Sequence, residues 1–496
     1  MISENEVISV QLGTLSNSTA VHFWHLQATE YRTQSCSRKE YASDSSPGIF
    51  FDETKAGLIP RALFVDFINL PDIPCDSRVT VPKKHSVLWD GEVNTVFRTN
   101  SDPNLQSKLP SSWLNCLTAN ERHIWINNDL ICNISSQHQE SSPCSSNRKF
   151  VGAFTKGLDL LSSGKPLMDT IEDRLRHLME RCSRPGSIQL VFDAEDGFSG
   201  MSSRVLEHVA EELPKRPIIA YPIYDTRTTM QSDISHQQLS KANSLFSLLL
   251  LEPDASEHFR GAYVPLDFSR SPHATHNCFR AATLAVAWST LASFITDQQS
   301  PSEFLTKCQA IHNQRMLTSC VGFTSAHRSE WLWNLLNPYS STDQPTGKTF
   351  WRQLILRGIP TGPAIDRLIK QLSCDTTNGG TQSDLNNHHN LLPPISLPAL
   401  YPGVQLQSTH KPDCLNVSKE YLYPNTQCQQ YDSLRAANVL DVPDGNSAEA
   451  ENLRRLVRDV KRKIPPEFEI EKDDWLEYME AAQSRLVDAY SQLRSN

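Results

Sequence analysis

Acidic side chains gather in the string DAEDGFSG, where Asp193, Glu195 and Asp196 follow an apolar run that is typical of a buried strand. Carboxylate oxygens are ligands that Mg²⁺ prefers, so this cluster could hold a magnesium ion that in turn binds phosphate. Without such a cation, the same carboxylates would repel a nearby triphosphate by an energy on the order of several kcal/mol. A second interpretation is structural, with Asp196 and Gly197 in a tight turn and Ser199 as the cap of the following helix.

Other residues that could do chemistry form weaker patterns. His273, His276 and Cys278 have the spacing H-x-x-H-x-C, but no second ligand pair lies at a recognisable spacing in the sequence. The sequence has no G-x-S-x-G string and no C-x-x-C pair, which argues against an α/β-hydrolase, a zinc ribbon or a thioredoxin-like site. We therefore predict neither a metal site nor catalytic residues.

Apolar runs of strand length alternate with helical patterns in the first half of the sequence. The runs that predict strands cover residues 7–12, 61–67, 188–193 and 217–223. Amphipathic helical patterns flank the third run, at 168–182 and 202–213, and another helical pattern follows the first run. This alternation predicts an α/β fold in which helices cover the faces of a parallel sheet.

The rest of the sequence divides into further regions. The uncharged apolar stretch at 281–296 is shorter than the ~20 residues that span a bilayer, so it predicts a buried helix. Polar segments at 134–147 and 374–390 predict flexible loops, and helical patterns at 451–464 and from Asp473 end the sequence. The predicted regions are an N-terminal domain at 1–260, a central helix and second domain at 261–373, a flexible loop at 374–395 and a C-terminal region at 396–496.

The composition limits the classes of function. The 496 residues include 47 Lys and Arg against 56 Asp and Glu, so the net charge of −9 argues against a nucleic-acid partner. Only 19 residues are glycine, fewer than an enzyme with several phosphate-binding glycine loops would use. No Lys or Arg precedes Arg32, unlike a secretory or mitochondrial targeting segment, and the twelve cysteines are scattered. These features predict a cytoplasmic protein with reduced thiols.

Four strings resemble landmarks of the tubulins, in the same order. They are QLGTLSNSTAVHFW at 11–24, GIFFDETKAGLIPRALFVD at 48–66, GAFTKG at 152–157 and SIQLVFDAEDGFSGMSS at 187–203. The last string lies where tubulins carry a glycine-rich loop. This replacement, together with SVLWDGEV at 86–93, resembles the Misato family, a divergent tubulin-like group. The resemblance implies a tubulin/FtsZ-like fold, with a doubly wound N-terminal domain of the nucleotide-binding type, a second α/β domain and C-terminal helices.

The resemblance also implies which residues would contact a nucleotide. By position, these are Gln11, Gly13, Asn17, Asp66, Ser146, Gly197, Ser199, Gly200 and Asn277. The departures from the tubulin pattern argue against catalysis. Ile68 replaces an acidic residue that lies near Mg²⁺ in tubulins, residues 144–148 lack the glycines of a second loop, and no GxxNxDxxE string occurs near 290–310. We therefore expect no GTP hydrolysis and no cofactor, with GTP and Mg²⁺ binding as the alternative.

The Misato family is associated with mitochondrial distribution, morphology and inheritance on the cytosolic face of the outer membrane. It is also linked to spindle microtubules and to the cytosolic chaperonin that folds tubulin. The resemblance thus implies a non-catalytic regulator of mitochondria whose partners include the outer-membrane surface, with tubulin and the chaperonin as further candidates. The alternative is a nucleotide-binding tubulin homologue that acts on microtubule or spindle assembly, or on tubulin folding with the chaperonin.

A basic cluster near the end of the sequence has two interpretations. Residues 454–463 carry six cations beside an apolar stripe of Leu453, Leu456, Val457 and Val460. Such a helix could bind anionic lipid head groups or the acidic tails of tubulins. The interpretation that we favour is a helix whose stripe packs on the body of the protein while its cations face solvent.

Overall fold

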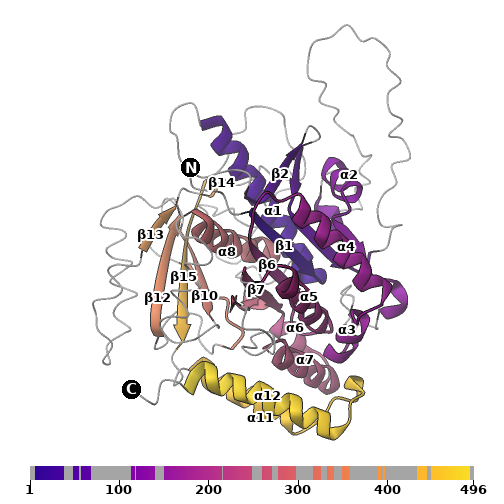
Figure 1. Cartoon of the computed structure of the whole chain (residues 1–496). Coiled ribbons are helices and arrows are strands. Elements are labelled where there is room, and N and C mark those ends of the chain that lie inside the picture. Colours follow the sequence, from indigo (N-terminus) through magenta and orange to yellow (C-terminus); the bar gives the residue numbers. More distant parts are fainter. Residues whose placement is uncertain are drawn as a thin grey trace, which may run out of the picture.

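Two β-sheets flank a long buried helix, as Figure 1 shows. The computed structural model describes residues 6–37, 49–54, 57–68, 113–117, 119–139, 150–214, 216–248, 260–270, 277–297, 317–324, 332–339, 349–357, 389–392, 395–396, 433–443 and 448–491. In these ranges, no helix is both long enough and apolar enough to cross a membrane.

The first sheet has seven strands in the order β5-β4-β1-β6-β7-β8, with β9 also paired to β7. Its strands are β1 (Glu6–Leu12), β4 (Ala62–Asp66), β5 (Ile131–Asn133), β6 (Pro185–Asp193), β7 (Pro217–Tyr224), β8 (Arg260–Tyr263) and β9 (Leu266–Asp267). Every pairing among them is parallel. The α/β prediction is therefore confirmed for this sheet, and β1, β4, β6 and β7 lie at the four predicted apolar runs.

Helices cover both faces of this sheet. The chain leaves β1 toward β4 but leaves β6 in the opposite direction toward β7, and right-handed crossovers then place α1 and α5 on opposite faces. The helices that follow or precede these strands are α1 (Thr14–Ser37), α2 (Ala119–Asn127), α3 (Phe154–Leu160), α4 (Pro166–Glu180), α5 (Phe198–Glu212), α6 (Thr226–Gln231), α7 (Ile234–Ser247) and α8 (Asn277–Asp297). Short 3₁₀ turns occur at Trp113–Cys116, Ser136–His138 and Phe268–Arg270, and a hairpin joins β2 (Phe51–Thr54) to β3 (Gly57–Pro60).

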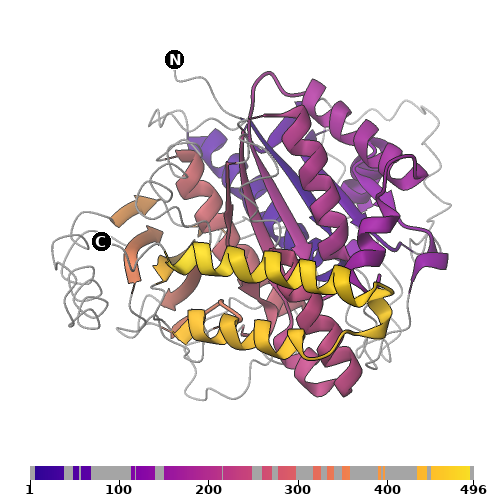
Figure 2. The same ribbon diagram turned by 60° about the horizontal axis from the view of Figure 1, so that its bottom comes forward.

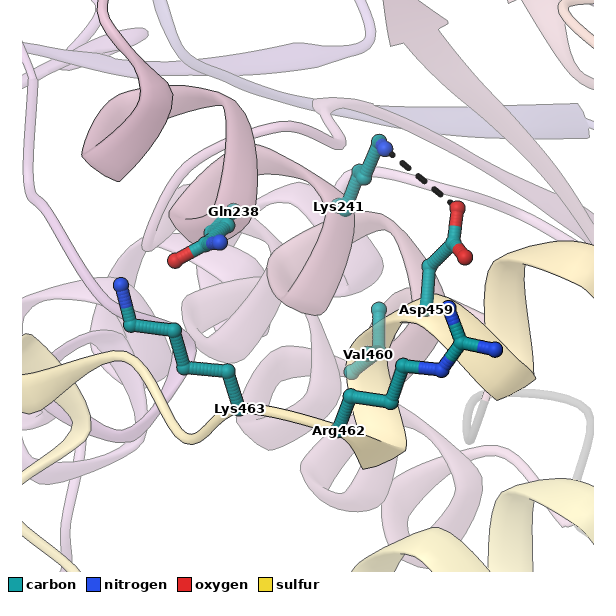
Figure 3. A pocket seen from close by; sticks show the side chains of 6 residues that line it. All are labelled: Gln238, Lys241, Asp459, Val460, Arg462 and Lys463. Atoms are coloured by element: carbon teal, nitrogen blue, oxygen red, sulfur yellow. Dashed lines mark ion pairs between the residues drawn. The ribbon is translucent and has the colours of Figure 1, made fainter.

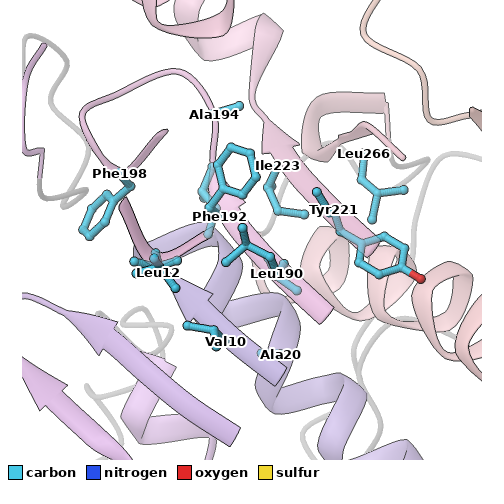
Figure 4. Close-up of a cluster of buried hydrophobic side chains, with 14 of the residues drawn as sticks. Val10, Leu12, Ala20, Leu190, Phe192, Ala194, Phe198, Tyr221, Ile223 and Leu266 are labelled. Atoms are coloured by element: carbon cyan, nitrogen blue, oxygen red, sulfur yellow. The ribbon is translucent and has the colours of Figure 1, made fainter. Parts of the chain in front are cut away.

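The core lies between the first sheet and its helices. Figure 4 shows side chains of β1, β6 and β7 in contact there, among them Leu12, Phe192 and Ile223, all of which are buried. All seven residues of β1 and all eight of β7 are buried, as is expected for parallel strands with helices on both faces. On the α1 side, the rings of Phe23 and Trp288 stack with centroids 3.8 Å apart, so α1 and α8 are in direct contact.

The second sheet has six strands in the order β11-β10-β15-β12-β13, with β14 paired to β15. They are β10 (Thr318–Thr324), β11 (Leu332–Leu335), β12 (Thr349–Arg357), β13 (His389–Leu392), β14 (Ile395–Ser396) and β15 (Ser433–Pro443). Only the β12–β13 pairing is parallel, and β13 falls within the segment 374–395, for which the sequence predicts a loop. The predicted buried helix at 281–296 is confirmed as α8, which contacts β10, β12, β13 and β15.

A buried ion pair joins the two sheets through α1. The guanidinium of Arg357, at the end of β12, pairs with the carboxylate of Glu30 on α1. The same guanidinium lies 3.4 Å from the Ser289 hydroxyl and 3.5 Å from the Ser293 hydroxyl, both on α8. Because Arg357 and Glu30 are both buried, the pair fixes β12 against α1 and α8.

Two helices from the end of the chain pack beside α7. Figure 2 shows α11 (Ala448–Lys461) and α12 (Lys472–Ser491) running side by side across the body, joined through a 3₁₀ turn at Pro466–Phe468. Leu453, Val457 and Val460 of α11 are buried, so the packing of its apolar stripe on the body is confirmed. Trp475 of α12 is also buried, and its ring lies 5.2 Å from that of Phe246 on α7.

Candidate functional site

The strand order of the first sheet reverses between β1 and β6, and ligands of open α/β sheets bind at the carboxyl ends of strands at such a point. The structure brings seven of the predicted contact residues to this region: Gln11, Gly13, Asn17, Asp66, Gly197, Ser199 and Gly200. Ser146 lies outside the described residues. Asn277 is the first residue of α8, and its side chain is not among those that the structure describes. We call the region at the carboxyl ends of β1 and β6 the switch-point crevice.

The carboxylate of Asp193 occupies the N-terminus of α1 in this crevice. Its Oδ1 accepts hydrogen bonds from the backbone N–H of Ser16 at 2.8 Å and from the Ser16 hydroxyl at 2.6 Å. Its Oδ2 accepts a hydrogen bond from the backbone N–H of Leu15 at 3.1 Å. Because helix N-termini bind anions through these same N–H groups, the chain supplies its own anion at the place where a phosphate would bind.

Gly13 makes the close approach of Asp193 feasible. Its φ of +105° lies in the region that favours glycine, and a Cβ atom there would lie 2.5 Å from Cγ of Asp193. The resemblance to tubulins implies that Gly13 contacts a nucleotide. In this structure the space beside Gly13 is filled by the Asp193 side chain instead.

The next two acidic residues of the same loop bind at two other helices. Glu195 accepts hydrogen bonds at the start of α6, from the backbone N–H of Asp225 at 2.6 Å and from the Thr229 hydroxyl at 2.9 Å. Asp196 accepts a hydrogen bond from the backbone N–H of Phe198 at 2.8 Å, at the start of α5. The acidic loop, which we define as residues 193–196, therefore places one carboxylate at each of three helix N-termini.

Ser199 does not cap α5, so that prediction is wrong. It is the second residue of the helix, and its hydroxyl donates to the backbone carbonyl of Asp196 at 2.7 Å. The side chain of Asp196 binds the first helical N–H in its place. The reason is that α5 begins at Phe198, one residue before Ser199.

Gly157 on α3, with Gly197 and Gly200 after the acidic loop, allows α3 and α5 to approach closely. A Cβ atom on Gly200 would lie 1.9 Å from the carbonyl oxygen of Phe154, and one on Gly157 would lie 1.8 Å from that of Gly197. A Cβ atom on Gly197 would lie 2.5 Å from a methyl carbon of Val151. Each of these close approaches is to another segment of the same chain. The packing of these segments therefore suffices to explain why glycine occurs at the three positions.

Asp66 is likewise engaged by its neighbours. One of its carboxylate oxygens accepts hydrogen bonds from the backbone N–H of Phe67 at 2.8 Å and from the Thr14 hydroxyl at 3.2 Å. The other accepts from the indole N–H of Trp113 at 2.8 Å. Ile68, which stands where tubulins have an acidic residue, donates its backbone N–H to the Asn133 side chain at 2.7 Å.

Two amide side chains of the predicted set, those of Gln11 and Asn17, are buried beneath the crevice. The Gln11 amide donates to the Ser9 hydroxyl at 2.6 Å, and the Asn17 amide donates to the carbonyl of Val65 at 3.1 Å. Both side chains are fully buried. Asn17 therefore links the first turn of α1 to β4.

Sequence reasoning missed Asn243, a buried residue of α7 that holds the acidic loop in place. Its side-chain oxygen accepts from the backbone N–H of Phe154 at 2.7 Å. Its amide donates to the carbonyls of Gly152 at 3.0 Å and Glu195 at 3.2 Å. No local motif marks this residue, because its partners come from two other segments of the chain.

These contacts decide whether the residues present fit a nucleotide phosphate or a magnesium ion. A phosphate would need the N–H groups of Leu15 and Ser16, which the buried carboxylate of Asp193 already binds. Among the described residues, no three His, Cys, Asp or Glu side chains come together as a set of metal ligands. The carboxylates of the acidic loop instead point to three different helices, so the crevice as built does not fit either group.

Comparisons with known proteins identify relatives of the chain. No protein-family model matches it. Protein dml1 of Aspergillus oryzae is 24% identical over 268 residues, which cover 49% of this chain and 52% of the relative. Protein DML1 of Gibberella zeae is 26% identical over 225 residues, which cover 43% of this chain and 45% of the relative.

A third relative has a different name. Protein misato homolog 1 of Danio rerio is 31% identical over 109 residues, which cover 20% of this chain and 18% of the relative. The match to the DML1 proteins spans about half of their length. On these matches the chain is a homologue of the DML1 and misato proteins, the Misato/DML1 family, at modest identity over about half of its length.

Proposed function

We propose that this chain is a non-catalytic, tubulin-like protein that regulates mitochondrial distribution, morphology and inheritance from the cytosolic face of the outer membrane. Membership of the Misato/DML1 family supports a Misato-type function in general. The mitochondrial role and the outer-membrane partner come from what that family is associated with. They are proposals for this chain.

The acidic loop is the observation that supports the proposal of a non-catalytic protein. Asp193 fills the anion position at the N-terminus of α1, and the loop's other two carboxylates bind α5 and α6. Placing a triphosphate against these buried carboxylates would bring like charges together in a medium that screens them poorly. A protein whose crevice is closed in this way would act through its surfaces.

The tubulin-like part has support in the arrangement of the two sheets. The first sheet is parallel with β1 at its centre, the apolar helix α8 separates it from a second sheet, and two helices from the end of the chain pack outside. This order of elements agrees with the four tubulin landmarks in the sequence. Fold alone does not give function, so the activity needs its own test.

The alternative is a nucleotide-binding tubulin homologue that acts on microtubule or spindle assembly, or on tubulin folding with the cytosolic chaperonin. It requires the acidic loop to move away from α1, or a cation to bridge the carboxylates and a phosphate. Calorimetry of the full chain with GTP, with and without Mg²⁺, separates the two proposals. We expect no heat of binding at concentrations approaching millimolar, whereas Mg²⁺-dependent binding in the micromolar range would favour the alternative.

The mitochondrial part needs a cellular experiment. We expect depletion of the protein to change the shape and position of mitochondria, and re-expression of the wild-type chain to restore them. Normal mitochondria with altered spindles, or with less folded tubulin, would contradict the proposal. Capture of the chaperonin by the purified chain, without binding to outer-membrane fragments, would point to tubulin folding.

A further inference from the structure

A pocket opens where the end of α11 meets α7. Six residues line it, as Figure 3 shows: Gln238, Lys241, Asp459, Val460, Arg462 and Lys463. Its volume is about 240 Å³. The pocket belongs to the outer surface of the helices and is separate from the switch-point crevice, so nothing in the proposed function depends on it.

The charges around this pocket are unbalanced. Three of its lining side chains are cations, from two different elements, and Asp459 is the single carboxylate among the six. Asp459 pairs with Lys241 at 3.5 Å, which offsets the repulsion that its carboxylate would exert on an anion. An ammonium group has three donors, so Lys241 can still donate to a second acceptor. The pocket therefore has two positive charges in excess.

Arg462 and Lys463 differ from Arg454 and Arg458, two other cations of this region, in their ion pairing. Arg454 and Arg458 each pair with Glu451, at 3.5 and 2.8 Å. For Arg462 and Lys463, which are exposed, the described part of the chain provides no ion pair. Their donors are available to a ligand without first breaking an internal contact.

The cations lie at two ends of the pocket. Figure 3 shows Lys463 reaching toward Gln238 at one end, while Lys241, Asp459 and Arg462 lie toward the other. Val460 forms an apolar part of the wall between them. A ligand that carries more than one anionic group on a compact body would match this separation better than a single small anion.

We propose that this pocket binds a phosphorylated polyol, either free in solution or as the head group of a lipid. Arginine and lysine both bind phosphate oxygens, arginine through a planar fork and lysine as a point charge. The cations also stabilise the C-terminal end of α11, but that role needs no pocket and no particular arrangement of Arg462 and Lys463.

The test uses the full chain and two probes. Calorimetry measures binding of inositol trisphosphate, and co-sedimentation measures binding to phosphatidylcholine vesicles with and without phosphatidylinositol bisphosphate. The pocket variant is Arg462→Glu with Lys463→Glu. Its matched control is Arg455→Glu with Lys461→Glu, which makes the same charge change at exposed positions of α11 that do not line the pocket.

We expect the pocket variant to weaken binding by at least about tenfold, because it converts two attractions into repulsions, and the control to weaken it by about twofold or less. Binding of the soluble probe alone identifies a free polyol phosphate, and binding of the vesicles identifies a lipid head group. Absence of binding to both probes overturns the proposal. Equal losses in the two variants also overturn it, because they would reflect the general field of the helix. The circular dichroism of both variants should match that of the wild type, since all four positions are exposed.

Discussion

Gly13 and Asp193 fit together so closely that no side chain can be added at residue 13 while Asp193 keeps its position. A Cβ atom on Gly13 would lie 2.5 Å from Cγ of Asp193 and 2.7 Å from one of its carboxylate oxygens. The carboxylate also accepts hydrogen bonds from the backbone N–H groups of Leu15 and Ser16, in the first turn of α1. The absence of a side chain at one strand end thus makes room for a charged side chain from the neighbouring strand end.

We expect Gly13→Ala to lower the free energy of unfolding by about 3 kcal/mol or more, because it combines an unfavourable φ with a collision. Gly164→Ala is the matched control, since Gly164 also has a positive φ, of +80°, but a Cβ atom there would meet no other atom within 4 Å. That control should cost about 1 kcal/mol. Urea denaturation measures both values, and equal losses would contradict the close fit of Gly13 to Asp193.

Removal of the Asp193 carboxylate should create a site for a free anion. We expect Asp193→Ala to lower Tm, and added inorganic phosphate to raise the Tm of this variant more than that of the wild type. The reason is that the N–H groups of Leu15 and Ser16 would then be available. Asp267→Ala is the control, because Asp267 is a buried carboxylate that binds Thr226 and Ser269 elsewhere. If phosphate raises the Tm of all three proteins equally, it acts through general exclusion from the surface.

The stability of the protein should depend on pH through His22. Burial in α1, and next the neighbouring His25, lower the pKa of His22 from 6.5 to about 3. Between these values the unfolded chain binds a proton that the folded chain does not, so the free energy of unfolding falls as the pH is lowered from 6.5 toward 3. The contribution approaches about 1.4 kcal/mol per pH unit.

The measurement is the urea midpoint as a function of pH. His22→Gln should flatten the slope between pH 6.5 and 3, whereas His177→Gln, at a position whose side chain is 78% exposed, should leave it unchanged. An unchanged slope in His22→Gln would mean that other groups cause the dependence.

The ion pair between Glu30 and Arg357 should matter more than the exposed pairs of the surface. Arg357→Met leaves the Glu30 carboxylate buried without its cation, which should cost about 3–5 kcal/mol. The double variant Glu30→Leu with Arg357→Met should cost less than Arg357→Met alone, since no buried charge is then left without its counter-charge.

Asp173→Ala provides the comparison for this ion pair. It removes the exposed pair between Asp173 and Arg176, whose side chains are 75% and 56% exposed, and should cost less than about 1 kcal/mol. Denaturation curves of the four proteins give the values. A double variant less stable than Arg357→Met would contradict the assignment of the cost to an uncompensated charge.

Much of the first sheet could be predicted from the sequence because β1, β4, β6 and β7 each contain a short run rich in apolar residues. The run at 188–193, for instance, is the core of β6, and the helical spacing at 168–182 corresponds to α4 at Pro166–Glu180. The apolar stripe of α11 is recognisable for the same reason. In each case, burial alone determines which residue types occur at which spacing.

The contacts of the crevice could not be predicted in this way. Asp193 and Ser16 are 177 positions apart, and no pattern in either segment indicates the other as its partner. Asp196 and Ser199 are both residue types that cap helices, so only the position of the first helical turn decides between them. The strands of the second sheet lack a clear alternation, and long segments of chain separate β12 from β13 and β14 from β15, so local patterns do not reveal their pairing.

The acidic loop has a consequence for how this protein could be regulated. An anion that is part of the chain is present at a fixed local concentration, whatever the supply of free phosphate or nucleotide in the cell. The Asp193 carboxylate does not exchange with free anions, and hydrolysis does not remove it. Under the proposed function, a crevice filled in this way would keep one shape, so any timing in the protein's action would have to be imposed from outside, by its abundance or by the partners that reach its surface.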